Sequence, residues 1–499
     1  MRTGVKYLFL IAFAVASTCC TASIQFKHSI GGNSPDHGYC ARQTYDNGYI
    51  AVGTTSSFTN GNSDIYVVRT DSNGIVAWTK NFGTANIEVA RYVEELKDSS
   101  IIIVGYTNNT TANGYDVYLL RLDRWGNKVW EKTYGGTDWE FAYSVHQTSD
   151  GGFIIAGGTY SYGKGSEDMY LIKTNINGDT TWTKTFGGRY DDEARSVRET
   201  AAGEFILTGY TKSFTDTTGG DAYVVKTNST GDTLWTKSYG GLKEDLANDI
   251  IECKNGDYVF CGRSYSYCNK NANMYLARLY NNGSLNWQIS NGLLKDSIYD
   301  SLESLVELQN GNLASIGVTF SYGGGQNEGY LLITNASGGF INGPTYGTGG
   351  KDECYSVAVT RDKGFIICGF TDSTKIGFNA PNLFLIKTDS TGQLPKMKFW
   401  FSVNDMNNGL INTIDTYPNP FTVQTNITIN SNEEIHPADL NLEFADITGR
   451  ICAANYRIVN SGSKNIELQI DRGNLQSGIY FVRYFLKYQF VGASKVIVE

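Results

Sequence analysis

Charged residues, prolines and histidines are all scarce in this sequence, and each shortage narrows the class of protein. Charged residues make up 18% of the chain, and 7 of its 499 residues are proline. A disordered chain would carry more charge and few aromatic residues, which amount to 13% here. The 4 histidines are scattered and no CxxC or HExxH motif is present, so no metal site is indicated. Nucleophile-elbow, phosphate-loop and dinucleotide-binding motifs are also missing.

Basic residues are outnumbered by acidic ones. The chain has 41 Lys and Arg against 50 Asp and Glu, for a net charge of −9. No stripe of basic residues is available to neutralise phosphates, so we expect no nucleic-acid partner. Solubility is a sufficient reason for the acidic surface.

A long apolar run is absent, and the N-terminus carries a short one. Residues 1–23 have the pattern of a signal peptide, with basic Arg2 and Lys6, an apolar run from Tyr7 to Ala16, and small residues after it. The run is shorter than the roughly 20 residues needed to span a bilayer. We expect cleavage near Ala22 or Ser23 and no transmembrane segment in the mature chain.

The cysteines follow no regular spacing. Cys261 and Cys368 occupy one column of the repeats described below, where another copy has Ala156, so we expect them to be small buried hydrophobic residues. No disulfide connectivity follows from the sequence for the remaining candidates. These are Cys40, Cys253, Cys268 and Cys354.

A unit of about fifty residues recurs seven times, and five tryptophans mark it. Trp78, Trp130, Trp182, Trp235 and Trp287 are separated by 52, 52, 53 and 52 residues. In the third copy, four strand-like segments from Tyr143 to Phe186 are joined by tight turns such as Ser149–Gly152. Four antiparallel strands per unit at this period are typical of a propeller blade.

The array begins with a lone fourth strand. Phe26–Gly32 aligns with Trp182–Gly188, whereas the last copy has Pro395 and Lys396 where its own fourth strand should be. We therefore predict an all-β fold, a seven-bladed propeller over residues 24–393 that the N-terminal strand 24–30 closes. The turns before the tryptophans resemble blade motifs of sialidase-like and quinoprotein-like propellers, and this resemblance implies architecture alone.

Glycine and hydroxyl residues recur at fixed places in the second strands. Each of these strands contains a glycine at the same position, which we expect to permit a bulge or a close backbone approach near the axis. A Ser or Thr follows two positions later in every copy, from Thr55 to Thr371. The glycines are Gly53, Gly105, Gly157, Gly209, Gly262, Gly317 and Gly369.

Acidic residues form two further columns, which hairpin geometry places at one end of each sheet. The first precedes each first strand and comprises Asp36, Glu88, Glu140, Asp192, Asp245, Asp300 and Asp352. The second precedes each third strand and includes Asp64, Asp116, Asp168, Asp221 and Glu328. One interpretation is that they cap turns by accepting backbone N–H bonds. The other is a ligand-binding acidic mouth, which would hold a cation such as calcium or the hydroxyls of a sugar.

Specific recognition is expected where the copies differ. The loops between second and third strands vary most and are rich in Tyr, Phe, Asn and Gly, a mixture suited to sugar or protein contacts. Trp125 and Trp139 lie outside the repeated tryptophan column. Both are candidate exposed anchors for a ligand, and both would alternatively pack between blades.

Composition changes after Gly392. Residues 394–413 have the character of a linker, and residues 414–499 alternate in a way that predicts a small β-sandwich. The strands expected there are 425–429, 440–446, 465–470, 479–485 and 493–498.

The last segment closely resembles the type A C-terminal sorting domain of type IX secretion cargo of Bacteroidetes-like bacteria. Four elements occur in the order of that family, and Cys452 and Ala453 replace its usual apolar pair. The resemblance implies contact with the type IX secretion machinery and a secreted or outer-surface location. The matching sorting-signal residues are Tyr417, Pro418, Asn419, Pro420, Gly449, Arg450, Gly478, Tyr480 and Lys495.

Three functional hypotheses follow. The first is a monomeric secreted or surface-attached binding protein whose propeller presents its variable loops to a glycan or a protein ligand, with no cofactor or with calcium. The second is a secreted hydrolase that acts on polysaccharide through a carboxylate pair of the acidic face, although seven similar environments do not separate two pKa values. The third is a scaffold that spaces something at the cell surface.

Overall fold

The computed structural model describes residues 24–394 and 411–499, apart from short stretches. In the first range these stretches are 60–61, 109–113, 216–218, 268–271, 292–298, 323–326, 348–349 and 373–379. In the second they are 433, 435, 438–439, 447–450, 453, 474 and 487–488. The chain divides into two compact units, residues 1–394 and 395–499. The predicted signal peptide, residues 1–23, lies outside the described residues.

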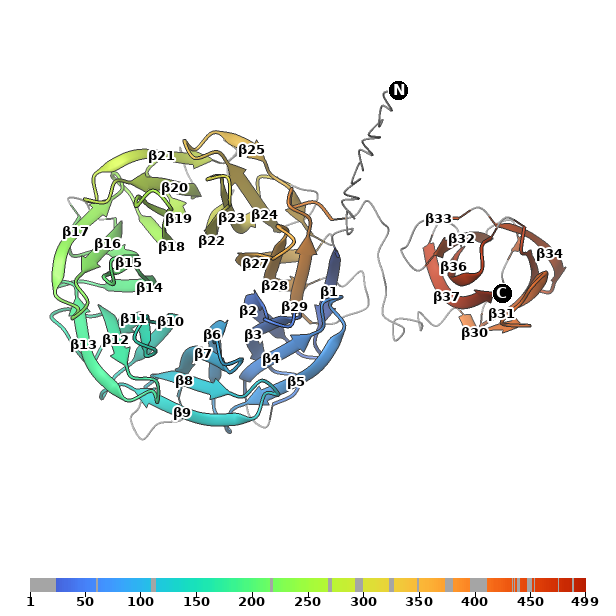
Figure 1. Ribbon diagram of the computed structural model, residues 1–499, viewed down its shortest axis with the longest axis horizontal. Helices are drawn as coiled ribbons and strands as arrows, with labels where there is room; N and C mark the ends of the chain where they lie inside the picture. The colour runs from blue at the N-terminus through green and yellow to red at the C-terminus, as the bar shows by residue number, and fades with distance from the viewer. Residues whose placement is uncertain are drawn as a thin grey trace, which may run out of the picture. The chain divides into compact units, whose positions relative to one another are not determined.

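The first unit is a β-propeller in which seven antiparallel sheets of described residues surround a common axis (Figure 1). Blade 1 comprises β2 (Asp36–Gln43), β3 (Tyr49–Thr55), β4 (Asp64–Thr70) and β5 (Val76–Phe82). Blade 2 comprises β6 (Glu88–Glu95), β7 (Ile101–Thr107), β8 (Asp116–Leu122) and β9 (Lys128–Tyr134). Blade 3 comprises β10 (Glu140–Gln147), β11 (Phe153–Thr159), β12 (Asp168–Thr174) and β13 (Thr180–Phe186).

The remaining sheets follow the same order from the axis outward. Blade 4 comprises β14 (Asp192–Glu199), β15 (Phe205–Thr211), β16 (Asp221–Thr227) and β17 (Thr233–Tyr239). Blade 5 comprises β18 (Asp245–Glu252), β19 (Tyr258–Ser264), β20 (Asn273–Leu279) and β21 (Leu285–Asn291). Blade 6 comprises β22 (Ser301–Glu307), β23 (Leu313–Thr319), β24 (Glu328–Thr334), β25 (Phe340–Asn342) and β26 (Thr345–Tyr346). Blade 7 comprises β27 (Lys351–Val359), β28 (Phe365–Asp372), β29 (Asn382–Thr388) and β1 (Phe26–Ile30).

The N-terminal strand closes the ring. β1 pairs antiparallel with β29, and Phe26 lies opposite Lys387 (Figure 1). A hydrophobic cluster between blades 7 and 1 joins Cys368 and Leu385 to Ala51 and Val68. Because this cluster is the counterpart of those between the other neighbouring blades, the ring has no open edge there.

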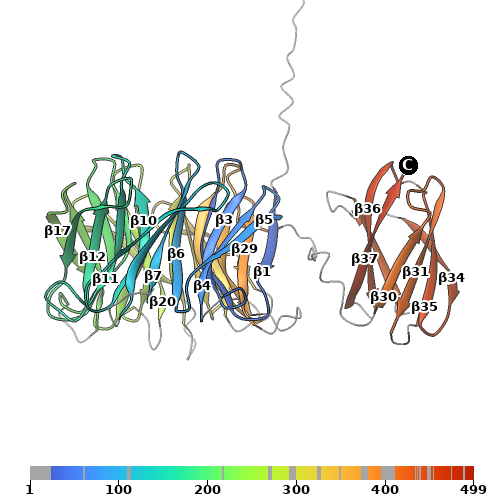
Figure 2. The ribbon, with the colours of Figure 1, turned by 90° about the horizontal axis from the view of Figure 1, so that it is seen from below.

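Apolar residues on both faces explain why the inner strands are buried. All seven residues of β3, β11 and β23 are buried. Ile102 and Val104 of blade 2, for example, share one cluster with Phe153 and Ile155 of blade 3. A strand with a single buried face would alternate, whereas these strands are covered by a neighbouring blade on each side. In the lateral view the strands of the propeller run from one face of the ring to the other (Figure 2).

The tryptophan column covers turns of the next blade. Gly126 has a φ of 77°, and a Cβ atom there would lie 2.8 Å from Cη2 of Trp78. Gly178, Gly231 and Gly283 meet the following tryptophans in the same way. A turn residue with positive φ favours glycine, and here the indole would also collide with any larger side chain.

The second-strand glycines permit the predicted close approach. A Cβ atom on Gly53 would lie 1.7 Å from the carbonyl oxygen of His37, and the other six glycines of the column are equally obstructed. The ladder shifts at this point, because Gly38 pairs with Gly53 but Cys40 pairs with Val52. Tyr39 is therefore the extra residue of a β-bulge, and the same shift occurs in the first strand of every blade.

The second unit is a β-sandwich of two four-stranded sheets. One sheet contains β30 (Ile411–Tyr417), β31 (Gln424–Ser431), β35 (Asn465–Asp471) and β34 (Asn455–Ser461). The other contains β33 (Ile451–Cys452), β32 (Leu440–Asp446), β36 (Gly478–Leu486) and β37 (Gln489–Val498). Ile427, Leu468 and Val482 lie in the core between them.

Three strands of the second unit, β30, β33 and β34, lie outside the strands that the sequence predicts, and β33 is a two-residue strand that pairs with β32. β30 begins at Ile411, within the predicted linker, because residues 411–417 pair with β31. β34 was not predicted, since its seven residues are all exposed and carry no alternating pattern.

Cysteine placement agrees with the small-hydrophobe prediction where it can be compared. Cys261 and Cys368 are buried and unpaired, as are Cys40, Cys253 and Cys354, so no disulfide joins the described cysteines. Cys268 lies outside the described residues. Nor does the described part of the chain contain a helix of the length and apolarity that crossing a bilayer requires.

Candidate functional site at the propeller axis

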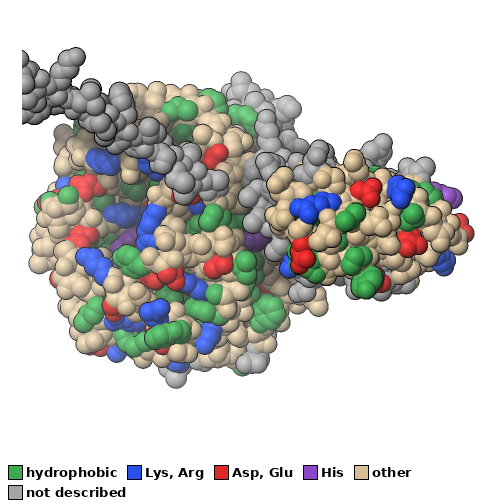
Figure 3. Space-filling view, turned by 45° about the vertical axis from the view of Figure 1, so that its right-hand side comes forward, with side chains coloured by type: hydrophobic (Ala, Val, Ile, Leu, Met, Phe, Trp, Pro, Cys, Tyr) green, Lys and Arg blue, Asp and Glu red, His purple; other side chains and the backbone are tan. Residues whose placement is uncertain are grey.

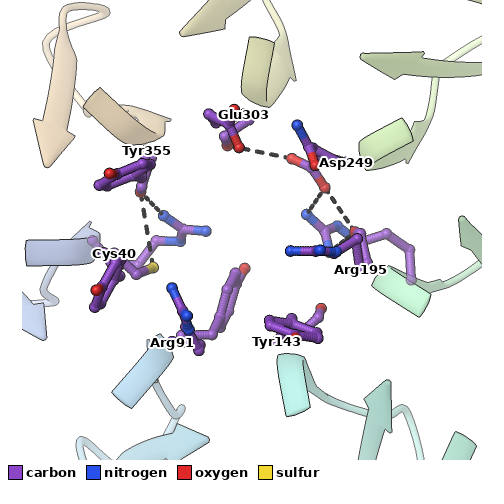
Figure 4. Close-up of a pocket in the computed structure, with 16 residues that line it drawn as sticks. Cys40, Arg91, Tyr143, Arg195, Asp249, Glu303 and Tyr355 are labelled. Atoms are coloured by element: carbon purple, nitrogen blue, oxygen red, sulfur yellow. Dashed lines mark hydrogen bonds and ion pairs between the residues drawn. The ribbon is translucent and has the colours of Figure 1, made fainter. Parts of the chain in front are cut away.

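Seven side chains from the bulges surround the propeller axis. Each bulge in a first strand leaves one residue without a partner on the second strand, and that residue lines a cavity at the centre of the ring (Figure 4). We call these residues the bulge ring. They are Tyr39, Arg91, Tyr143, Arg195, Asn248, Glu303 and Tyr355.

Tyrosine and arginine alternate along one side of the bulge ring and stack on each other. The guanidinium carbon of Arg91 lies 4.3 Å from the ring centroid of Tyr39 and 5.7 Å from that of Tyr143. The guanidinium carbon of Arg195 lies 4.6 Å from the ring of Tyr143. Tyr39 and Tyr355 continue the series with centroids 5.4 Å apart. These cation–π contacts hold both guanidinium groups at the cavity wall.

The two arginines differ in their partners. Arg195 forms an ion pair of 2.6 Å with Glu193. Arg91 donates a hydrogen bond of 3.1 Å to the hydroxyl of Tyr106, and no described carboxylate lies within ion-pair distance of it. The Nε atoms of both arginines are buried without an acceptor among the described residues. The arginine side of the ring therefore has spare donors and an unneutralised positive charge.

Acidic groups lie on the opposite side of the ring. Burial raises the pKa of Glu303. The hydroxyl of Ser301 donates a hydrogen bond of 2.6 Å to this carboxylate and lowers its pKa in part. Tyr355 donates a hydrogen bond of 2.6 Å to Glu353. Asn248 donates to the carbonyl oxygen of Leu302 at 2.9 Å, so its amide is fixed in place.

A second polar layer lies three residues further along the first strands. His146 joins two blades, since Nδ1 lies 3.0 Å from a carboxylate oxygen of Glu94 and Nε2 lies 2.5 Å from Nη1 of Arg198. Arg198 in turn forms an ion pair of 2.9 Å with Asp249. Arg42 lies over the ring of Tyr92 at 4.6 Å. Glu94 and Asp249 thus lie beside His146 and Arg198, whereas Arg42 donates hydrogen bonds to the Ala41 carbonyl oxygen at 2.8 Å and the Ser356 hydroxyl at 3.0 Å and forms no ion pair with a described carboxylate.

The axial cavity is small and polar. It has a volume of about 90 Å³ and extends from the bulge ring to Arg42 and Arg198. Since a water molecule takes up about 30 Å³ of liquid, it holds a few waters or one small charged group. Two guanidinium groups facing such a space fit a planar carboxylate, to which arginine donates two parallel hydrogen bonds.

The first acidic column is buried and hydrogen-bonded. Glu140 accepts hydrogen bonds from the Thr159 hydroxyl at 2.7 Å and from the Gly136 and Ser161 amides at 2.8 and 3.1 Å. The hydroxyl column of the second strands thus supplies the donors, a link that the sequence did not reveal. Asp36, Glu88, Asp192 and Asp300 bind the corresponding hydroxyl in their own blades. Asp245 accepts from Ser266 and Gly241, and Asp352 is also buried.

The second column meets the first at the junctions between blades. A Cβ atom on Gly187 would lie 2.0 Å from an oxygen of Asp168 and 2.8 Å from one of Asp192. Burial and the charge of Glu140 raise the pKa of Asp116 at the equivalent place. The same arrangement pairs Asp64 with Glu88, Asp116 with Glu140, Asp221 with Asp245 and Glu328 with Asp352.

The hydrogen bonds accepted by the first column favour the turn-capping interpretation there, whereas one buried oxygen each of Asp116 and Asp245 has no donor among the described residues. On the propeller face in view, acidic side chains lie among basic and hydrophobic ones and form no single patch (Figure 3). A ligand-binding role for the columns stays a prediction.

The two unrepeated tryptophans are exposed on opposite faces. Trp139 precedes β10 and is 45% exposed, on the face where the first strands begin, which we call the upper face. Trp125 lies in the turn between β8 and β9 at the other face and is 63% exposed. Both are therefore accessible, but they cannot serve a common site.

The sorting residues of the second unit gather around the last strand. The Asn419 side chain donates to the carbonyl oxygen of Lys495 and accepts from the amide of Ile497, both at 2.7 Å. Tyr480 donates to the carbonyl oxygen of Gln476 at 2.8 Å, close to Gly478. Tyr417 is exposed, and the carbonyl oxygen of Pro418 accepts from Thr425 at 2.6 Å, next to Pro420 in the chain. Gly449 and Arg450 lie outside the described residues.

Comparison with known proteins gives this second unit a family. Residues 415–499 match the secretion system C-terminal sorting domain. This segment is a type IX secretion sorting domain. It marks the protein for export to the cell surface or the surroundings and for handling by the type IX machinery.

The chain is also similar to a characterised protein over part of its length. The chain is 28% identical over 194 residues to the regulatory protein FlaEY of Caulobacter vibrioides, which covers 34% of this chain and 20% of that protein. The chain thus spans about a fifth of that relative's length.

Solved structures with a similar fold share little sequence. The Pan2 WD40 domain of Neurospora crassa has 12% identity and a TM-score of 0.41, over 73% of this chain and 96% of that one. The β-propeller domain of the Trilobed protease from Pyrococcus furiosus has 8% identity and a TM-score of 0.40, over 75% and 99%. PorZ, a surface component of the type IX secretion system of Porphyromonas gingivalis, has 10% identity and a TM-score of 0.36, over 88% and 69%.

Proposed function

We propose that this exported protein is a binding protein whose propeller holds the carboxylate of a ligand in the axial cavity. Arg91 and Arg195 would receive the carboxylate, and the polar side of the ring at Glu303 would accept hydrogen bonds from hydroxyl groups of the same ligand. The supporting observation is the unneutralised guanidinium group of Arg91, held between two tyrosine rings at the cavity wall.

The arrangement at the cavity carries this proposal further than the alternatives. Arg91 is partly buried, and a cation that has lost part of its hydration without gaining a counter-ion would gain from meeting an anionic ligand. The hydrolase hypothesis depends on the acidic columns, in which members such as Glu140 and Asp168 already accept hydrogen bonds from hydroxyl or amide groups. A pure scaffold gives no reason for spare arginine donors at the axis.

Calorimetric titration of the full chain with D-galacturonate tests the proposal, with D-galactose as the neutral comparison. We expect galacturonate to bind, galactose to bind at least tenfold more weakly, and added salt to weaken the galacturonate complex. Arg91→Met should reduce galacturonate affinity at least tenfold, while Arg124→Met, at an exposed turn arginine, should leave it unchanged.

Equal affinity for the two sugars, or full affinity in Arg91→Met, would overturn the proposal. The unfolding midpoint of each variant shows whether the propeller is intact. If the protein releases reducing ends from polygalacturonate, it is a hydrolase and the assignment as a binding protein is wrong.

A further inference from the structure

A path of aromatic side chains leads from the axial cavity to the upper face. It starts at Tyr106, whose hydroxyl accepts the hydrogen bond from Arg91. The ring of Tyr106 lies 5.0 Å from that of Phe141 and 5.5 Å from that of Tyr115, measured between centroids. Each of these three side chains is partly exposed.

The path ends at two aromatic residues that are open to solvent. The Trp139 ring lies 5.9 Å from Tyr115, 6.2 Å from Phe141 and 6.2 Å from Tyr160. Trp139 is 45% exposed and Tyr160 is 39% exposed. We call the five residues Tyr106, Tyr115, Phe141, Trp139 and Tyr160 the aromatic path.

The outer end of the path is rigid. The amide of Tyr160 donates to the carbonyl oxygen of Trp139 at 2.8 Å. The Tyr160 hydroxyl donates to Glu167 at 3.1 Å, and Glu167 is buried. Exposed rings that are already held in place lose little entropy when a ligand stacks on them.

We propose that the ligand is an oligosaccharide that carries a uronic acid, with its carboxylate in the bulge ring and its next sugar rings on the aromatic path. This inference rests on the proposed function and adds the class of ligand and a second subsite to it.

Three observations select this ligand. The cavity of about 90 Å³ admits a charged group but not a chain, so the rest of the ligand must lie outside it. Aromatic rings offer flat apolar faces to the C–H faces of sugars while leaving sugar hydroxyls in water. A neutral glycan would leave Arg91 without an anion, and an apolar peptide would not need it.

The test compares one and three sugar units on the full chain. Trigalacturonate should bind at least tenfold more tightly than galacturonate. Trp139→Ala should remove this gain and leave galacturonate affinity unchanged, because Trp139 belongs to the outer subsite. Trp139→Tyr should restore much of the gain. The matched control is Trp125→Ala, which removes an exposed tryptophan from the opposite face and should change neither affinity.

The outcomes separate the two proposals. If galacturonate binds through Arg91 but the trimer binds no better, or Trp139→Ala keeps the gain, the aromatic path is not a subsite and only the carboxylate site stands. If neither sugar acid binds, both proposals fail. If an oligo-aspartate peptide binds as tightly as trigalacturonate and depends equally on Trp139, the ligand is an acidic peptide and the glycan assignment is wrong.

Discussion

Nη1 of Arg198 lies 2.5 Å from Nε2 of His146, so the imidazole accepts a hydrogen bond from a cation. This fixes the proton of the neutral ring on Nδ1, where it is donated to Glu94. Tyr92 packs against the ring edge at 4.9 Å, and Arg42 is the further charge nearby. These contacts favour the neutral form of His146, whose pKa is lowered by burial and by Arg198.

Acid should destabilise the propeller through His146. Burial lowers the pKa of His146 and Arg198 lowers it further, against the opposing effect of Glu94. The unfolded chain therefore binds a proton near pH 6.5 that the folded chain resists, and stability present above that pH is lost as the pH falls. Lowering the pH from 7.5 to 5 should reduce the melting midpoint of the His146→Gln variant less than that of the unaltered protein. The same change at exposed His436 should make no difference, and parallel curves for His146→Gln would contradict this account.

Alkali should act through Glu167. Burial, and next the charge of Glu193, raise the pKa of Glu167 to about 8. A carboxyl group whose pKa is raised in the folded chain contributes its full stability below its unfolded-state pKa. This contribution to the free energy of unfolding is lost as the pH rises through about 8. Glu167→Gln should therefore melt higher than the unaltered protein at pH 9 and similarly at pH 5. Glu131→Gln, an exposed carboxylate paired with Lys128, is the control and should show no gain at pH 9.

Gly209 should not tolerate alanine. A Cβ atom there would lie 1.9 Å from the carbonyl oxygen of Glu193, within the backbone beside the bulge that carries Arg195. We expect Gly209→Ala to lose about 4 kcal/mol or more, or to prevent folding. Gly203→Ala in the same blade meets no atom within 4 Å and has only its φ of 73° against it, so about 1 kcal/mol is expected. Chemical denaturation measures both, and similar losses would contradict the packing argument.

Calcium and turn capping make different predictions for Asp192. Its side chain accepts hydrogen bonds from the Gly188 amide at 2.8 Å and from the Thr211 hydroxyl. Loss of these bonds should cost Asp192→Ala about 2 kcal/mol in chelator as well as in calcium. If calcium stabilises the fold at this column, the unaltered protein should melt higher in excess calcium than in chelator, and the variant should lose that difference. Equal melting of the two proteins in chelator would count against a capping role.

The repeat made the propeller architecture predictable from the sequence. The axial site was harder to predict, because it is formed at a position where the residue type differs between blades. Arg91, Tyr143 and Arg195 follow Tyr39 at the same spacing of 52 residues as the tryptophans. The sequence did not single them out, because their column contains different residue types and lies within a strand, whereas functional positions were expected in uniform columns or in variable loops. Their position could have been inferred from the second-strand glycine, since a predicted bulge opposite it would have directed attention to one residue of each first strand.

Repeated ion pairs were missed for a related reason. Lys173 of a third strand pairs with Asp150 of the preceding hairpin at 2.8 Å, and five other blades contain an equivalent pair. In blade 6, Ile333 stands in the basic position. A basic residue inside an apolar strand is informative only once its partner, twenty or more residues earlier, is known to be a neighbour.

The pairing of Phe26 with Lys387 has a consequence for how the chain is made. The two residues are separated by 387 − 26 = 361 positions, so the first strand to leave the ribosome must wait for one of the last parts of the propeller. A product truncated before residue 382 would keep six sheets yet leave its leading strand unpaired, and such an edge invites aggregation. Sharing one sheet between both ends therefore makes completeness of the translated propeller a condition for its solubility.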